Sequence, residues 1–157
     1  MPNSYRLDEL TARMKAALDA DVRKGSNLSE VPVVYDQVPM PQTQPAVYQL
    51  YIEPVDIAIP AEQPKTAMAF QRFFHTFRLW LVVYNSSVAV ARSDWAKFLD
   101  NVMLILGDLT NDGSSYWYHG LMTTIAPSAT HQNIEAAGDV RVRCGYVDFT
   151  FIQEKNL

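Results

Sequence analysis

Seven prolines between positions 32 and 64 constrain this 157-residue chain more than any other feature. Proline has no backbone N–H to donate to a sheet ladder, and it breaks helices. Between the prolines, β-branched and aromatic residues fill three short runs, at 31–35, 47–53 and 55–59. We therefore expect short strands that lie at sheet edges or are broken by bends. Residues 39–46 and 60–72 show no core pattern and are predicted to be exposed loops.

Two other segments have the apolar periodicity of amphipathic helices. In residues 5–24, apolar side chains recur every three or four positions, and Gly25 follows as a stop signal. Residues 93–110 carry a wider apolar stripe, with Ser93 and Asp94 as the predicted N-terminal cap. We expect this second helix to be the main partner of a sheet.

The sequence predicts a central strand over residues 73–84, because both of its faces carry apolar side chains. Two further strands are expected, at 117–126 and 139–153, with a loop centred on Pro127 between them. The alternation in the last strand changes phase beside Gly145, which predicts a β-bulge or a bend. This order of elements predicts one α+β domain over residues 1–157, with a mainly antiparallel sheet packed by two helices.

Composition excludes several classes of protein. The chain has 13 Lys and Arg residues against 17 Asp and Glu residues, for a formal net charge of −4, whereas sequence-independent nucleic-acid binders are basic. One cysteine precludes an intrachain disulfide. The most apolar stretch, 73–84, is shorter than the roughly 20 residues of a membrane span, and no secretory signal is recognisable. We expect a globular protein of the cytoplasm that does not bind membranes.

No catalytic, cofactor or metal motif occurs, so we expect a protein that is not an enzyme. The histidines, His75, His119 and His131, lack metal-ligand spacing, and structural roles are predicted for them. Cys144 falls in the apolar register of a strand, which argues against a nucleophile paired with His119. The aromatic run 116–118 is interpreted as core packing first and as a partner contact second, since Tyr and Trp are favoured at interfaces.

The elements follow one another in a specific order. An N-terminal amphipathic helix leads into the Pro-rich strands, and three segments follow: FFHTFRLWLVVYN, then SDWAKFLDNVMLILGDL, then GDVRVRCGYVDFTFIQE. This order resembles the tail terminator, or tail-completion, proteins of long-tailed bacteriophages. The resemblance implies a hexameric ring in the neck of the virion, assembled in the host cytoplasm, that caps the tail tube protein and binds head-completion or connector proteins. It also implies that DNA passes through the lumen without specific binding, which suits an acidic chain.

Two parts of the chain are candidates for an assembly interface. The loop 39–46 brings Met40 and the adjacent Val47 within reach of a neighbour. The last strand, beyond Gly145, is expected to add its edge to a neighbouring sheet, with Tyr146, Phe149 and Phe151 as the contact residues. A ring results when such a head-to-tail interface closes on rotation.

Two alternatives stay open at this point. One is a stopper or another head–tail joining protein of the neck. The other belongs to a different class: a small α+β ligand-binding domain or hydrolase. It would use a pocket between the second helix and the sheet, lined by Trp95, Trp117 and Tyr118.

Overall fold

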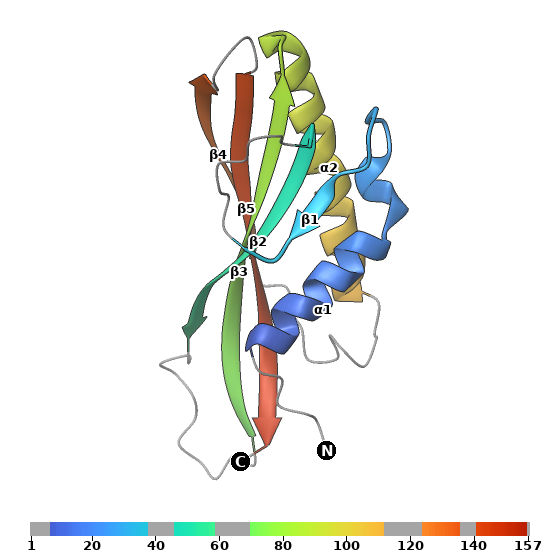
Figure 1. Cartoon of the computed structure of the whole chain (residues 1–157). Helices are drawn as coiled ribbons and strands as arrows, with labels where there is room; N and C mark the ends of the chain where they lie inside the picture. Colours follow the sequence, from blue (N-terminus) through green and yellow to red (C-terminus); the bar gives the residue numbers. More distant parts are fainter. Residues whose placement is uncertain (1–6, 38–45, 59–69, 112–123, 136–140, 157) are drawn as a thin grey trace.

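The computed structural model describes residues 7–37, 46–58, 70–111, 124–135 and 141–156, which Figure 1 shows in colour. Within these ranges, side chains are described at 8–37, 46–56, 74–108 and 143–150. The elements in chain order are α1 (Leu7–Ala20), the 3₁₀ helix η1 (Val22–Gly25), β1 (Val33–Tyr35), β2 (Tyr48–Ala58), β3 (Phe70–Asn85), α2 (Val88–Asn111), β4 (Thr124–Glu135) and β5 (Arg141–Asn156).

The described strands form one five-stranded sheet in the order β1-β2-β3-β5-β4. β1 runs parallel to β2, and every other pairing is antiparallel. Both helices pack against the same face of the sheet, α1 over β1 and β2, and α2 over β3 and β5 (Figure 1). The predicted α+β class, with a mainly antiparallel sheet packed by two helices, is confirmed.

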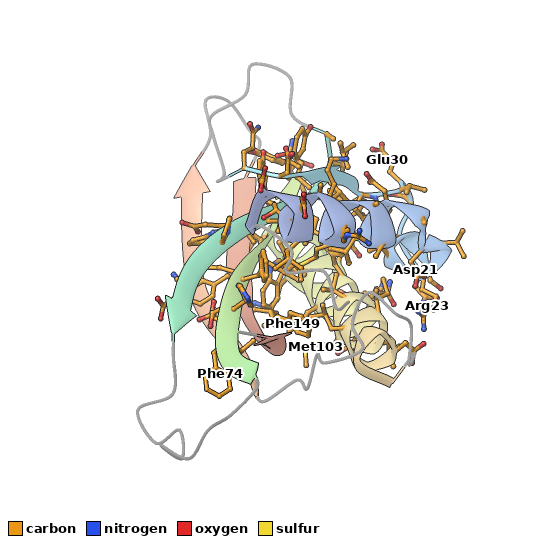
Figure 2. All side chains as sticks on the ribbon, turned by 90° about the horizontal axis from the view of Figure 1, so that it is seen from below. Asp21, Arg23, Glu30, Phe74, Met103 and Phe149 are labelled. Carbon is orange, nitrogen blue, oxygen red and sulfur yellow. The ribbon has the colours of Figure 1, made fainter. Side chains whose placement is uncertain are left out.

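The large apolar core lies between the helices and this face of the sheet. Phe77, Leu79 and Leu81 point into it from alternate positions of β3. Figure 2 shows Phe149 of β5 and Met103 of α2 in the same region. Each such side chain stabilises the fold by about 1.5–3 kcal/mol when fully buried. Neither described helix is long and apolar enough to cross a membrane.

The first helix is shorter than the predicted span 5–24. α1 ends at Ala20, and η1 follows as a separate 3₁₀ helix. Asp21 separates the two, because its side chain accepts the backbone N–H of Arg23 at 2.9 Å and so caps a new helical turn. The apolar period continues across this cap and does not reveal it. Residues 5 and 6 lie outside the described residues.

The second helix begins earlier than the predicted span 93–110. Its N-terminal cap is Ser87, whose hydroxyl lies 3.4 Å from the backbone nitrogen of Val90. The predicted Ser93–Asp94 cap was therefore wrong, since both residues lie inside α2. Asp94 instead accepts a hydrogen bond from the phenol of Tyr48 at 2.8 Å, which ties the helix to the sheet.

The Pro-rich strands differ in length from the prediction, since β1 is shorter than the run expected at 31–35 and β2 is longer than either run expected after it. β2 joins the runs expected at 47–53 and 55–59 into one strand, with a register shift between Pro54 and Asp56 where the sequence predicted a break. A register shift at this point accommodates proline, which has no N–H to donate to the neighbouring strand. The structure corrects the predicted loop 60–72, since residues from Phe70 onward belong to β3. The rest of that loop, and residues 39–45, lie outside the described residues.

The strand predicted at 117–126 and the loop centred on Pro127 were also misplaced. β4 spans Thr124–Glu135, and Pro127 lies within it, paired with Val147 of β5. β4 is an edge strand of the described sheet, where one missing donor is tolerated. Residues 117–123 lie outside the described residues.

β5 pairs with β3 without the register shift that the sequence predicted beside Gly145. In the ladder with β4, a register shift does lie opposite Gly145, and its extra residues belong to β4, between Ser128 and Gln132. Gly145 instead makes room for an indole: an added Cβ would come within 2.3 Å of Cζ2 of Trp95. Trp95 Nε1 donates to the carbonyl of Leu81 at 3.0 Å. The glycine therefore marks a close helix–strand contact.

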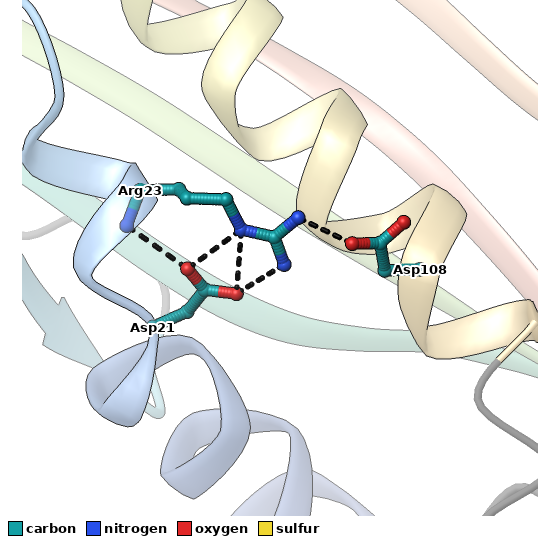
Figure 3. Close-up of polar contacts among 3 residues, drawn as sticks. All are labelled: Asp21, Arg23 and Asp108. Atoms are coloured by element: carbon teal, nitrogen blue, oxygen red, sulfur yellow. Dashed lines mark hydrogen bonds and ion pairs between the residues drawn. The ribbon is translucent and has the colours of Figure 1, made fainter.

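Polar contacts tie η1 to α2 (Figure 3). The guanidinium of Arg23 donates to the carboxylate of Asp21 and to that of Asp108 on α2. Asn101, which is buried on α2, donates through its side-chain amide to the carbonyl of Ser26. These contacts fix the position at which the chain turns from α1 toward β1.

The close contact between Gly145 and Trp95 predicts that alanine at this glycine lowers stability, whereas alanine at an uncrowded glycine does not. Gly145→Ala should lower the free energy of unfolding by about 1–3 kcal/mol, because the added methyl group overpacks the core. Gly107→Ala on α2 is the matched control: its added Cβ meets no atom within 4 Å. It should raise that free energy by about 0.5–1 kcal/mol, since alanine favours helix. Urea denaturation measures both, and equal effects would contradict the contact.

We predict that the ionised carboxylate of Asp21 stabilises the fold and that this stabilisation is lost in acid. The hydrogen bond from Arg23 holds the pKa of the Asp21 carboxyl below its ordinary value of 3.8. This stabilisation is present above the unfolded-state pKa and is lost as the pH falls through the folded-state pKa. Asp21→Asn keeps a capping oxygen without the charge, so its free energy of unfolding should fall less between about pH 5 and pH 2. Urea denaturation across this range is the measurement, and a decline equal to that of the wild type would refute the assignment.

Candidate interaction surface

The face of the sheet opposite the helices carries the candidate site, and we call it the open face. Both described helices pack on the other side. The strand register arranges the open face in rows that cross neighbouring strands. The aromatic row consists of Tyr35, Tyr51, Trp80 and Tyr146, from β1, β2, β3 and β5. The charged row consists of Glu53, Arg78 and Asp148, from β2, β3 and β5.

The aromatic row is held by ring contacts at both ends. The rings of Tyr35 and Tyr51 stack at a centroid distance of 4.8 Å and an angle of 19°. Those of Trp80 and Tyr146 meet at 5.0 Å and 59°. Tyr51 is 1% exposed, and burial raises its pKa to about 12. Trp80 and Tyr146 are half-buried, so part of each ring stays accessible.

The charged row is joined to the aromatic row by a central arginine. Arg78 donates to Asp148 through two nitrogens, at 2.8 and 3.0 Å. Its guanidinium carbon also lies 4.0 Å from the ring centroid of Tyr146. The hydrogen bonds to Asp148 raise the pKa of Arg78, which therefore stays charged. Trp80 Nε1 donates to Glu53 at 2.8 Å, so both acids of the row have partners.

These features are typical of protein–protein interfaces. Tyr, Trp and Arg are the residues that dominate binding energy when they are half-buried and well packed. Here each of them already has its partner within the sheet, so little side-chain freedom remains to be lost on association. The open face is therefore suited to pack against another protein.

A second feature is a shallow hollow of about 730 Å³ where β3 leads into α2. Ser29, Tyr48 and Asp94 supply polar groups to its wall. Burial raises the pKa of Tyr48, and the Asp94 carboxylate that accepts a hydrogen bond from its hydroxyl raises it further. The phenol therefore acts as a donor that joins β2 to α2.

The pocket predicted between the second helix and the sheet is not formed by Trp95. That side chain is 5% exposed and packs on Gly145, and it does not line the hollow. Trp117 and Tyr118 lie outside the described residues, as does the rest of the aromatic run 116–118.

The residues considered for catalysis or metal binding lie apart. His75 is 2% exposed on the helix side of β3. His131 lies in β4 with its side chain outside the described part, and His119 is outside it altogether. Cys144 is half-buried on the open face, beside Val82. Among the side chains that the structure describes, no three His, Cys, Asp or Glu residues gather as a metal site.

The predicted interface residues fall in different parts of the molecule. Tyr146 belongs to the aromatic row. Phe149 is 1% exposed in the main core, and Val47 packs partly buried against that core. Met40 and the side chain of Phe151 lie outside the described residues. Of the five, Tyr146 is thus the residue found on the open face.

The strand edge predicted to join a neighbour, residues 145–153, is occupied over most of its length. Up to Thr150, β5 lies between β3 and β4 and is paired on both sides. Beyond Thr150, β3 is the one strand of the described sheet that pairs with β5. Among the described residues, β5 therefore lacks a second partner strand only beyond Thr150.

The sequence alone did not reveal that Tyr35, Tyr51 and Arg78 belong to one surface. A partial signal was present, because Arg78 and Trp80 share a face of the predicted strand 73–84. Their neighbours on other strands depend on register. An alternating pattern with apolar groups on both faces does not determine that register.

Comparison with known proteins adds a likeness of fold. No family model matches the chain, and a search of curated proteins finds no match. Among solved structures, a chain in the virion of a native gene transfer agent (GTA) particle shares the fold with a TM-score of 0.52 and 19% sequence identity. The alignment covers 96% of this chain and 100% of that chain. The likeness therefore extends over the whole domain.

We predict that the thiol of Cys144, on the open face, reacts slowly with disulfide reagents. Burial raises the pKa of its thiol to about 11. At pH 8, roughly one molecule in a thousand then carries the reactive thiolate. A disulfide reagent followed by absorbance should modify the native chain at least about a hundredfold more slowly than the urea-unfolded chain, whose thiol has an ordinary pKa. Similar rates in both states would show that the thiol is accessible.

Proposed function

We propose that this chain is a structural protein of a phage-like virion and not an enzyme. The observation that carries the proposal is the fold shared over 96% of the chain with a chain of the GTA virion. Structural virion proteins work through the surfaces by which they pack on one another. The open face, with its half-buried aromatic and arginine side chains, supports such a role.

Within the virion, we propose a position at the end of the tail. The order of elements, which resembles that of tail terminator proteins, supports a hexameric ring that caps the tail tube and offers a surface for head attachment. Its partners would be the tail tube protein and the head-completion or connector proteins. DNA would pass through the lumen without specific binding, and a net charge of −4 suits a passage that must release phosphates.

The open face supplies one of the contacts that such a ring requires. A closed ring needs a head-to-tail interface in which two different surfaces of the subunit meet. Trp80 and Tyr146 present accessible ring surface on a rigid, register-fixed sheet. Anchors of this kind contribute most when a partner excludes water from around them.

Light scattering on a sizing column, followed by negative-stain imaging of the same peak, tests this function. A closed ring with a central hole is the expected result, either alone or after mixing with isolated tail tubes. A strict monomer that fails to bind tubes would refute the role. Binding to filled heads but not to tubes would favour a stopper, and a monomer stabilised by a small molecule would favour a ligand-binding domain.

A matched pair of variants tests the open face itself. Tyr146→Ala should weaken ring formation or tube binding at least about tenfold, because it removes a half-buried aromatic anchor. Val22→Ala is the control, since Val22 is an apolar residue that is 85% exposed on η1. Melting temperatures establish that both variants fold. Equal assembly by both would show that the open face is not the contact.

A further inference from the structure

Arg143 is a buried cation whose charge the described structure does not neutralise. It lies near the start of β5, on the helix side of the sheet, and is 5% exposed. Its Nε is buried and has no hydrogen-bond acceptor. The ring of Trp95, 5.9 Å from the guanidinium carbon, is the aromatic group against which it lies. A guanidinium taken out of water in this way needs an anion to offset the loss of hydration.

The charged groups described near Arg143 increase its need for an anionic partner. Burial lowers the pKa of Arg143, and the neighbouring Arg92 of α2 lowers it further. α2 has no acidic residue in its first turn. Its first acid, Asp94, is already engaged by Tyr48 at 2.8 Å and by Lys97 at 3.4 Å. The described residues around Arg143 thus bring positive charge without a counter-ion.

Elsewhere on the described surface, some acidic side chains form no ion pair. Several acids are paired within the subunit, such as Asp148 with Arg78. Four exposed acids form no ion pair within the described residues: Glu30, Asp36, Asp56 and Asp100. A second copy of the chain would carry the same unpaired carboxylates. Each subunit therefore carries both the Arg143 guanidinium and exposed carboxylates that can pair with it in another copy.

We infer that Arg143 receives a carboxylate from an exposed acidic side chain of a neighbouring copy when the subunits assemble. This inference rests on the proposed function, because it requires copies packed side by side. A guanidinium offers parallel N–H donors that match the two oxygens of a carboxylate. In the proposed ring, each subunit gives a carboxylate to one neighbour and receives one at Arg143 from the other, so the contact is head-to-tail.

Arg143→Met tests the inference with two readouts that move in opposite directions. Removing an uncompensated buried charge should raise the melting temperature of the isolated subunit by about 2 °C or more. The same change should weaken assembly at least about tenfold, because the partner's carboxylate loses its cation. Arg13→Met on α1 removes the same charge from another element and should leave assembly unchanged. Arg143→Lys, which keeps the charge but not the paired donors, should also weaken assembly.

The partner acid can be identified by a second set of variants. Glu30→Gln, Asp36→Asn, Asp56→Asn and Asp100→Asn each remove one candidate carboxylate. One of them should reproduce the assembly defect of Arg143→Met. Combining that variant with Arg143→Met should cause little further loss, since both remove the same interaction. Full additivity for all four would overturn the inference.

Three other results would also overturn it. Wild-type assembly by Arg143→Met would show that no subunit contact uses the arginine. A less stable isolated subunit would place its partner within the same chain, for example at Glu135, whose backbone pairs with Arg141. A rise in melting temperature with about 10 mM phosphate, seen in wild type but not in Arg143→Met and without any assembly defect, would indicate a small-anion site.

The failure of the proposed function is distinguishable from these results. If the wild-type chain forms no assembly with itself or with tail tubes, the proposed function fails, and this inference falls with it. If the wild type assembles and Arg143→Met assembles equally well, only the inference fails.

Discussion

The antiparallel pairing of β3 with β5 is the constraint on which the rest of the structure depends. It runs without a shift from Phe70, opposite Asn156, to Asn85, opposite Arg141. Because side chains alternate between the two faces, a slip of β5 by one residue would exchange its core and surface side chains. The same register places Gly145 beneath Trp95 on one side and Tyr146 beside Trp80 on the other.

The register also explains how α2 comes to lie where it does. Trp95 fits only over a position without a side chain, and its indole donates to the Leu81 carbonyl of the adjacent strand. Tyr48 reaches the same helix from β2 and donates to Asp94. Contacts from three strands thus hold the first half of α2, and the rest buries apolar side chains that contribute about 1.5–3 kcal/mol each. Neither described α-helix covers the opposite face of the sheet.

Strong periodicity made much of this fold predictable, and local chemistry accounts for what was missed. The strand at 73–84 and the second helix were recognised because each repeats its apolar pattern over several turns or pairs. The break at Asp21 and the strand through Pro127 were not, since each depends on one side chain or on an edge position. The open face required knowledge of which strands pair and in which register, and no single strand contains that information.

The strand edges bear on the assembly that we propose. In β2, Pro54 lies beyond the residues that pair with β1 and next to a register shift in the ladder with β3, and β4 carries Pro127 and a register shift before Gln132 in its ladder with β5. Proline and irregular edges are features that hinder strand addition. Contact through faces is then favoured, and the open face and Arg143 lie on opposite sides of the sheet. The proposed head-to-tail ring uses two unlike surfaces of one subunit, whereas a twofold dimer packs one patch against its own copy.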